Sequence, residues 1–543
     1  MELILVVVGA IVLTAVAQRR GLQPALVIVV IGLAVSFTPG FPGIELGSRV
    51  LLSVVVPPLL YSAALDFSFP TFLRNIRPIL GLGVGLIAIT ALAVAGVASW
   101  VVPTMGFATA VMLGAVVAPP DAVSAVAVGR KLGMPRRVMA ILKGESLVND
   151  AAALALFTVA LTHAAGDRPF IGNPLLLFAY GAAIGPLIGV ALGYVTLWIR
   201  RRLAHPGLET IQGLVVPYAA YLCADRVHAS AVLAVVAAGF VVGQGSLRAG
   251  YLTRLQERYV WNSVDVLLEA FVFAYIGLQL RFVVQDMRAA HDSPKQVVAV
   301  SAAVLLTVLV VRPVWVFLMF RSGPRSADGE SKTSRHLPAW GRPLPRRALT
   351  WREKVLVSWT GMRGVVTLAA ASAIPQHNIA GEHFAHRSTS QVVAFVVTVG
   401  TLLLQGSTLP LVIRRLRPGF ERETTDAAAA TAKAEQLAGD VAVEVLDQFE
   451  HDPPPDLDTA AVTDIRRTIA GRVHDADTTP SPDFDATHAA LASSLYRQVL
   501  ASQRAALITR RDAGTLDDEI VRAMLERLDL QEAGVTARLN GRF

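Results

Sequence analysis

The chain has 543 residues, of which 53% are hydrophobic and only 17% are charged. A soluble protein of this length normally carries about 25% charged residues, so the composition excludes an ordinary soluble globular protein. The mean hydropathy is +0.53 and the formal net charge is +8. These values favour an integral membrane protein with one large membrane domain.

Apolar segments long enough to cross a bilayer follow one another through the first 415 residues. The chain is therefore predicted to be an all-α integral membrane protein with about 13 transmembrane helices. The 13 spans lie near residues 2–17, 23–38, 47–65, 78–102, 106–129, 137–164, 173–200, 210–224, 230–245, 262–281, 295–320, 352–375 and 390–414.

Lys and Arg residues alternate between successive loops, with 26 in one set of loops and 7 in the other. Because short cytoplasmic loops retain positive charge during insertion, the N-terminus is predicted to lie outside and the C-terminus in the cytoplasm. A cleaved signal peptide is the alternative reading of the first span. It is disfavoured, because no basic residue precedes this span and Arg19 and Arg20 follow it.

The fifth span is interrupted by Pro119 and Pro120, which are followed by Asp121. Neither proline has an N–H, so the carbonyls of Ala115 and Val116 lose their helical partners and the helix is expected to break. Broken backbone at bilayer depth is tolerated only where it is buried in protein or lines a cavity. Freed carbonyls beside Asp121 would suit a small cation, whereas a proline kink that serves packing alone is the alternative.

The sixth span carries four polar residues within two helical turns, namely Glu145, Ser146, Asn149 and Asp150. On a helix Glu145 and Asn149 share one face, and Ser146 and Asp150 share the adjacent face. All four can therefore point into one polar cavity. Ionisable groups at bilayer depth cost roughly 2.5–3.5 kcal/mol each, so a functional site is favoured over polar packing between helices.

Two arginines, Arg312 and Arg363, lie inside the eleventh and twelfth spans. A permanently charged guanidinium at this depth needs a carboxylate or carbonyl partner, and Glu145 is the candidate for Arg312. Glycines flank Arg363 and indicate irregular or closely approached backbone. The fifth and twelfth spans thus both look interrupted and run in opposite directions, as inverted repeats with crossing broken helices would.

The composition changes after Pro418, because residues 420–543 carry 23 acidic and 13 basic side chains while the preceding part carries 18 and 36. The predicted domains are a transmembrane domain over 1–418 and a helical cytoplasmic domain over 419–543. Helices are expected over 427–449 and 486–511, with a capped start of another near 515–519 and a linker over 451–458. A regulatory role, support of a dimer, or a merely solvated appendage all fit the tail sequence.

Four stretches resemble the monovalent cation:proton antiporter-1 family, the sodium/proton exchangers, in its bacterial branch. They are PPDAVSAVAV from 119, GESLVNDAAAL from 144, RPVWVF from 312 and GMRGVVTLA from 361. The similarity extends over most of residues 1–415, and the tail resembles the cytoplasmic extension of bacterial members. The resemblance implies a thirteen-helix fold with a dimerisation domain and a core domain that moves against it.

The resemblance also implies roles for the intramembrane residues. Asp150 would bind cation or proton in turn, supported by Asn149, and Ser146 would help to ligate the cation. Asp150 and Ser146 are thus the expected ligands of the transported Na+ or K+. The family pattern further implies a structural ion pair between Glu145 and Arg312, a crossing-helix aspartate and a crossing-helix arginine, which here are Asp121 and Arg363.

This sequence departs from the family pattern at the crossing, where many members have Thr-Asp-Pro and this chain has Pro120, Asp121 and Ala122. A threonine ligand is therefore missing, which leaves the preference among Na+, K+ and Li+ open. Asn149 beside Asp150 resembles the electroneutral, one-for-one exchangers and not those with paired aspartates.

The predicted function is secondary active exchange of Na+ or K+ for H+, which would serve pH and sodium homeostasis. A lone carboxylate in a semi-dry cavity is expected to hold either a proton or a cation, so that the two exclude one another. A membrane-embedded hydrolase that uses Ser146 is disfavoured, because the sequence has neither a His-Glu-x-x-His nor a Gly-x-Ser-x-Gly motif. A sodium-coupled symporter of a small solute is the closer rival.

The sequence predicts no cofactor apart from the transported cations and protons. Its single cysteine, Cys223, excludes an intramolecular disulfide. The transmembrane part is basic and the tail is acidic. The positive net charge of the whole chain therefore reflects membrane topology and does not indicate nucleic-acid binding. The expected location is the plasma membrane of a bacterium, with the lipid bilayer as surroundings, and the resemblance implies a homodimer.

Overall fold

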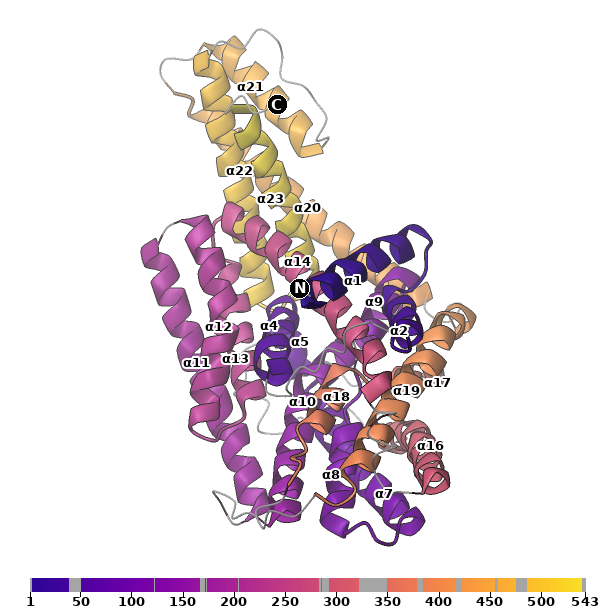
Figure 1. The fold of residues 1–543 in the computed structure, drawn as a ribbon. Coiled ribbons are helices and arrows are strands. Elements are labelled where there is room, and N and C mark those ends of the chain that lie inside the picture. The colour runs from indigo at the N-terminus through magenta and orange to yellow at the C-terminus, as the bar shows by residue number, and fades with distance from the viewer. Residues whose placement is uncertain are drawn as a thin grey trace.

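The protein is a bundle of helices from one end of which a smaller group of helices projects (Figure 1). The structure is a computed structural model. It describes residues 2–38, 50–121, 123–166, 171, 173–203, 205–282, 285, 293–321, 349–377, 384–416, 421–454, 458–474 and 486–539.

Each of the 13 apolar spans expected from the sequence coincides with one helix or with a run of consecutive helical pieces. In the part of the chain that the structure describes, six helical stretches are long and apolar enough to cross a membrane, and five shorter apolar helices accompany them. The helices are α1 (Glu2–Arg19), α2 (Pro24–Val35), α4 (Val56–Asp66), α5 (Phe69–Arg74), α6 (Ile76–Leu80), α7 (Leu86–Val101), α8 (Phe107–Val117), α9 (Val123–Leu132), α10 (Arg136–Ala165), α11 (Pro174–Leu203), α12 (Pro206–Arg226), α13 (Ala231–Ser246), α14 (Tyr251–Leu278), α16 (Pro294–Met319), α17 (Trp351–Trp359), α18 (Val365–Ser372) and α19 (Arg387–Leu416), with π-helical turns η1 (Leu51–Val55) and η2 (Gly81–Gly85) leading into α4 and α7.

Two of the apolar spans are broken where the sequence predicts a break. The fifth span is divided into α8 and α9 because Pro119 and Pro120 cannot donate backbone hydrogen bonds. The twelfth is divided into α17 and α18 by the segment from Thr360 to Gly364. A capping box formed by Thr350 and Glu353 begins α17.

The helices of the apolar part pack mainly within two groups. The α10 group comprises α7 to α10 and α16 to α19, and the α14 group comprises α1, α2, α4 and α11 to α14. Close approach within the α14 group depends on glycine at the contact of α2 and α14. A Cβ atom added at Gly32 would lie 2.9 Å from the Cα atom of Gly277, so neither position tolerates a side chain without movement of a helix.

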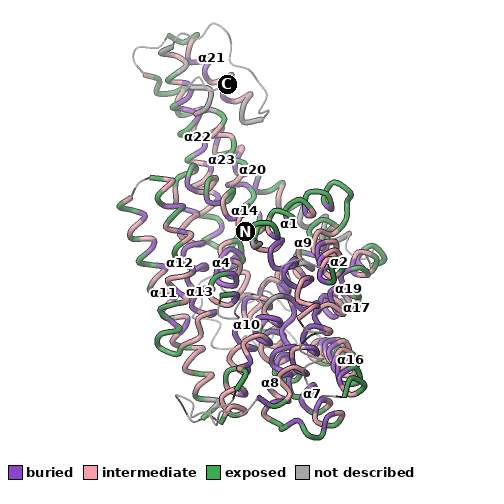
Figure 2. Tube along the Cα trace, viewed as in Figure 1, coloured by how far each residue is buried: buried purple, intermediate pink, exposed green. Residues whose placement is uncertain are grey.

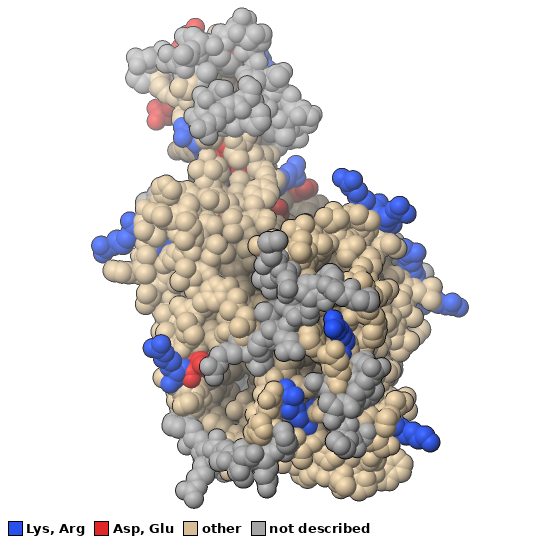
Figure 3. All heavy atoms as spheres, in the orientation of Figure 1, with Lys and Arg blue, Asp and Glu red and all other residues tan. Residues whose placement is uncertain are grey.

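The outer surface of the bundle is apolar. Large exposed side chains such as Trp100, Leu187, Trp198 and Leu306 point away from the buried interior, which Figure 2 shows in purple. On the face shown in Figure 3, most of the body is uncharged and the visible Lys and Arg side chains are scattered. An apolar outer surface of this extent is expected where lipid is the solvent.

Four helices form the projecting tail, namely α20 (Glu421–His451), α21 (Thr459–His474), α22 (Ala486–Asp512) and α23 (Asp518–Leu539). The sequence predicts α20, α22 and the start of α23, whereas α21 was not predicted. The cap of α23 is Asp517, whose carboxylate accepts from the Glu519 N–H at 2.9 Å. Apolar residues from all four helices form one cluster, which also includes Leu247 from the connection between α13 and α14.

Acidic residues of the tail pair with basic residues at the start of α14. The Asp529 carboxylate on α23 accepts from Arg254 Nε at 2.6 Å, and Arg258 on α14 pairs with Glu526 at 2.7 Å. Arg504 on α22 also pairs with Asp529, at 3.0 Å. One of the arginine-rich loops and the acidic tail therefore lie at the same end of the molecule, as their opposite charges favour.

Replacement of Asp529 by alanine is expected to release the tail from α14. The carboxylate side chain is only 3% exposed, so its loss leaves the largely buried Arg254 without an acidic partner, whereas Arg504 keeps its pair with Glu532. Removing one partner of such a pair typically costs about 3–5 kcal/mol. We expect trypsin to cleave the tail of the Asp529→Ala protein faster than that of the native protein.

A matched control is Glu435→Ala, which removes the partner of Arg527 in a pair with both side chains about half exposed. Exposed pairs of this kind contribute about 0–1 kcal/mol, so its cleavage rate should stay near that of the native protein. Equal cleavage rates for the two variants would contradict a stabilising role of Asp529 in docking.

Candidate functional site

The four polar residues predicted on the sixth span lie on α10 and divide between its two faces. Glu145 and Asn149 are completely buried, and they point away from solvent. Ser146 and Asp150 are half-buried and line a cavity. The two pairs lie on different faces of α10, as their helical spacing predicts, and the two faces have different environments.

Glu145 and Arg312 form an ion pair that joins α10 to α16. Arg312 donates to the two carboxylate oxygens of Glu145 at 2.5 and 2.9 Å, and both side chains are 2% exposed. The third nitrogen, Nε, donates to the carbonyl of Val357 in α17 at 2.9 Å. This bidentate arrangement ties three helices of the α10 group together and pairs a charge that otherwise has no partner in this interior.

The two interrupted spans meet at their breaks. The N–H of Asp121 donates to the carbonyl of Met362 at 2.5 Å, so the two non-helical segments are hydrogen-bonded to each other. Gly364 lies directly against Asp121, since a Cβ atom added at the glycine would lie 2.7 Å from the Cβ atom of Asp121. The absence of a side chain at Gly364 is therefore what allows the two segments to approach.

Arg363 binds the buried C-terminal end of α8. Its guanidinium donates to the carbonyls of Val117 and Ala118 at 3.0 and 3.2 Å, and also to the carbonyl of Gly361. A cation at the C-terminus of a helix compensates carbonyl groups that have no intrahelical partner. Asn149 plays the same part for Pro120, because its amide donates to that carbonyl at 2.6 Å.

These contacts concern carbonyls next to the two that the sequence predicts to be freed, those of Ala115 and Val116. The carbonyls of Val117, Ala118 and Pro120 accept hydrogen bonds from Arg363 and Asn149, so these three are not left for a cation. The structure thus assigns to Arg363 and Asn149 the satisfaction of broken backbone, which sequence spacing alone cannot show.

A cavity of about 70 Å³ lies between the two helix groups. It has room for a small cation with a few waters, since each water needs roughly 10–15 Å³ of such volume. Asp121, Ser146 and Asp150 lie together on its wall. The full lining is Val56, Leu59, Leu60, Ala63, Pro119, Pro120, Asp121, Ser146, Asp150, Glu269, Val272, Phe273, Gly364, Val366 and Thr367.

Two polar residues of this wall were missed by the sequence analysis, Glu269 on α14 and Thr367 on α18. Thr367 is 1% exposed, and its hydroxyl has no hydrogen-bond partner in the described part of the chain. The signal for Glu269 was present in the sequence, because it is a carboxylate in the middle of an apolar span. Thr367 carried no such signal, since a threonine in a membrane helix usually bonds to its own backbone.

Within the described residues, His, Cys, Asp and Glu side chains nowhere converge in groups of three as ligands of a resident metal ion do. Asp121, Asp150 and Glu269 share the cavity wall without such convergence.

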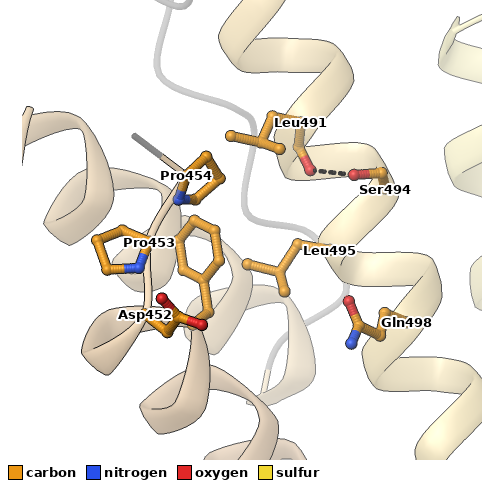
Figure 4. A pocket seen from close by; sticks show the side chains of 8 residues that line it. Asp452, Pro453, Pro454, Leu491, Ser494, Leu495 and Gln498 are labelled. Carbon is orange, nitrogen blue, oxygen red and sulfur yellow. Dashed lines mark hydrogen bonds between the residues drawn. The ribbon is translucent and has the colours of Figure 1, made fainter. Parts of the chain in front are cut away.

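A second, larger hollow of about 370 Å³ lies in the tail between the end of α20 and α22 (Figure 4). Among the described residues that line it, Asp452 is the one with an ionisable side chain, and Ser494 donates within α22 to the carbonyl of Leu491 at 2.9 Å. The lining also includes the apolar residues Phe449, Pro453, Pro454 and Leu495. This surface hollow shares no residue with the cavity beside Asp150.

Comparison with known proteins identifies the class to which this arrangement belongs. Residues 3–415 match the family described as "Sodium/hydrogen exchanger, transmembrane". An uncharacterized Na(+)/H(+) exchanger of Mycobacterium tuberculosis is 29% identical, over 98% of this chain and 95% of that protein. A protein of Bacillus pumilus described as a "Sodium, potassium, lithium and rubidium/H(+) antiporter" is 28% identical, over 70% of this chain and 56% of that protein.

Among solved structures, the fold is similar to that of the sodium proton antiporter MjNhaP1 from Methanocaldococcus jannaschii. The TM-score is 0.57 at 16% sequence identity, with 77% of this chain and 99% of that chain covered. At this identity the similarity concerns the fold alone.

The buried pair of Glu145 and Arg312 generates a prediction about stability. Arg312→Ala leaves the Glu145 carboxylate without its guanidinium partner in the interior, a change that typically costs about 3–5 kcal/mol. We expect a large decrease in the yield of monodisperse protein and in the thermal unfolding temperature in detergent.

The double variant Glu145→Ala, Arg312→Ala serves as the comparison, because it removes both charges and strands neither. It should be more stable than Arg312→Ala alone. A normal unfolding temperature for the single variant, or a double variant less stable than the single one, would contradict the role of the pair.

Proposed function

The chain belongs to the sodium/hydrogen exchanger family, a family of transporters and not of enzymes, and we propose that it exchanges Na+ or K+ for H+ at Asp150. The observation that supports this most strongly is the position of Asp150 on the wall of a cavity between two helix groups. Its carboxylate has neither a hydrogen bond nor an ion pair with any residue that the structure describes.

Exchange follows from the cost of an unpaired carboxylate in such a place. A bare negative charge is poorly solvated in a small, largely apolar cavity, so Asp150 is stabilised by binding a proton or a cation. One carboxylate cannot hold both at once. If the cavity changes its access between the two sides only when Asp150 is occupied, each cycle exchanges one cation for one proton.

The residues around Asp150 support the proposed one-for-one stoichiometry and the proposed ligands. Ser146 lies one turn before it on the same face of α10 and offers a hydroxyl to the ion. Asn149, the neighbouring residue, is engaged with the carbonyl of Pro120 and adds no charge. The proposed cation site is therefore Asp150 with Ser146, supported by Asn149 and Asp121.

We also propose the finer features of the fold that the family resemblance implies. These are thirteen membrane crossings with inverted repeats, of which α8–α9 and α17–α18 would be the crossing broken helices. The α10 group would be the moving core and the α14 group the dimerisation domain of a homodimer. Residues 1–418 would form the transport domain and 419–543 a cytoplasmic domain, in the plasma membrane of a bacterium with the N-terminus outside.

A symporter of an organic solute is the less favoured function. Cavities that enclose small organic molecules usually measure about 300–1,000 Å³, whereas the cavity beside Asp150 measures about 70 Å³. The proposed substrates include more than one monovalent cation, because a relative is named a sodium, potassium, lithium and rubidium/H(+) antiporter. Physiologically, such exchange would serve pH and sodium homeostasis.

Replacement of Asp150 by asparagine is expected to abolish exchange and leave a folded protein. The amide has nearly the shape of the carboxylate but binds neither a proton nor a cation with comparable strength. The measurement is proton flux into proteoliposomes, followed with an internal pH-sensitive dye after a Na+ or K+ gradient is imposed and no other solute is added.

Asp225→Asn is the matched control, because it makes the same change at an exposed residue near the end of α12. It should exchange at the native rate. Cation-dependent proton flux that survives in the Asp150→Asn protein would exclude Asp150 as the exchange carboxylate.

A further inference from the structure

Glu269 contributes a third carboxylate to the cavity, in addition to Asp121 and Asp150, from a helix of the α14 group. It lies on α14, and the residues that follow it on the same helix, Val272 and Phe273, line the cavity as well. Asp150 lies on α10. Because α10 and α14 belong to different helix groups, the carboxylates of Asp150 and Glu269 are carried by different walls of the same small space.

The environment of Glu269 gives its charge no compensation from the protein. In the described part of the chain it has neither a hydrogen bond nor an ion pair, and the charges within electrostatic range are those of Asp121 and Asp265, which are also acidic. A carboxylate so placed is costly unless it binds a proton or a cation. The nearest source of such compensation is the cavity that it lines.

Asp265, one helical turn before Glu269, differs from it in having a side-chain partner. It accepts a hydrogen bond from the Ser62 hydroxyl of α4 at 2.6 Å and does not line the cavity. That bond connects α14 to α4 and gives Asp265 a structural role. Glu269 lacks such a bond in the described part of the chain, although both residues have the same charge and stand on the same face of α14.

A second observation, independent of the carboxylates, also indicates a ligand in this space. The Thr367 hydroxyl on α18 lines the cavity, is 1% exposed as a residue, and has no partner among the described groups. A buried polar group without a partner costs about 1–3 kcal/mol, so it is expected to bind something that the cavity contains. A cation or the water that it carries would satisfy the hydroxyl and the carboxylates together.

We propose that Glu269 is a second cation-binding residue of the exchanger, which holds the incoming cation at the α14 wall and delivers it to Asp150. The proposal rests on the exchange function proposed above. Glu269 lies on α14, whereas Asp150 lies on α10. Glu269 therefore sets the affinity with which a cation enters the cavity. Asp150 remains the residue that carries cation and proton in turn.

The test is the cation dependence of exchange in proteoliposomes that contain the full-length Glu269→Gln protein. The KM for Na+ should rise roughly tenfold or more, as expected when one charge-assisted contact is lost, with a smaller effect on the maximal rate. Glu269→Asp, which keeps the charge on a shorter side chain, should restore much of the affinity. Binding of Na+ to the detergent-purified protein, measured by calorimetry, should weaken in parallel.

Asp265→Asn is the matched control, since it removes one negative charge from the same helix outside the cavity. It should leave the KM for Na+ within about twofold of the native value, because the Asp265 carboxylate is bonded to Ser62 and does not line the cavity that the cation enters. An equal rise in KM for Asp265→Asn and Glu269→Gln would show a general field effect and overturn the proposal. An unchanged KM and an unchanged calorimetric affinity for Glu269→Gln would overturn it as well.

The two proposals fail in different ways. If Asp150→Asn abolishes exchange while Glu269→Gln changes neither KM nor Na+ affinity, only the role of Glu269 is wrong. If Asp150→Asn retains exchange, the exchange site itself is misplaced, whatever the behaviour of Glu269.

Discussion

The structure depends on one constraint, that a charge or a backbone polar group without a partner is energetically costly inside an apolar body. Arg363 shows how the constraint is met. Two helices are broken at the same depth, which frees carbonyl groups at the end of α8, and one guanidinium from the second break binds those carbonyls. These hydrogen bonds therefore reduce both the cost of breaking one helix and the cost of burying an arginine.

The same constraint divides the polar residues of the interior into two sets. Glu145 with Arg312 and Asn149 with Pro120 are satisfied within the protein, and they hold the α10 group in a fixed shape. Asp150 and Glu269 have no such partner among the described residues, and both line the cavity between the helix groups. Unsatisfied polar groups persist in proteins mainly where function needs them, which is why we place the exchange of ions there.

The tail follows the electrostatics of the membrane part. Its net charge of −10 opposes the +18 of the preceding residues, and its acidic side chains are paired with arginines at the start of α14. The Arg522 guanidinium of α23 also donates to the carbonyl of Leu65, at the end of α4, at 3.2 Å. The tail therefore contacts the two helices of the α14 group that bear Glu269 and Ser62, and it is physically connected to one wall of the cavity.

The sequence by itself determined the class of protein, the positions of the apolar helices, the break at Pro119 and Pro120, and the family. These features depend on local chemistry, namely the length of apolar runs, the missing N–H of proline and the cost of a charge in lipid. Only the tertiary structure decided which groups would be satisfied. Arg363 bonds to the carbonyls of Val117 and Ala118, which are 246 and 245 residues away in the sequence, and Glu269 shares its cavity with residues of α4, α10 and α18. No local rule specifies which of these segments the packing brings together.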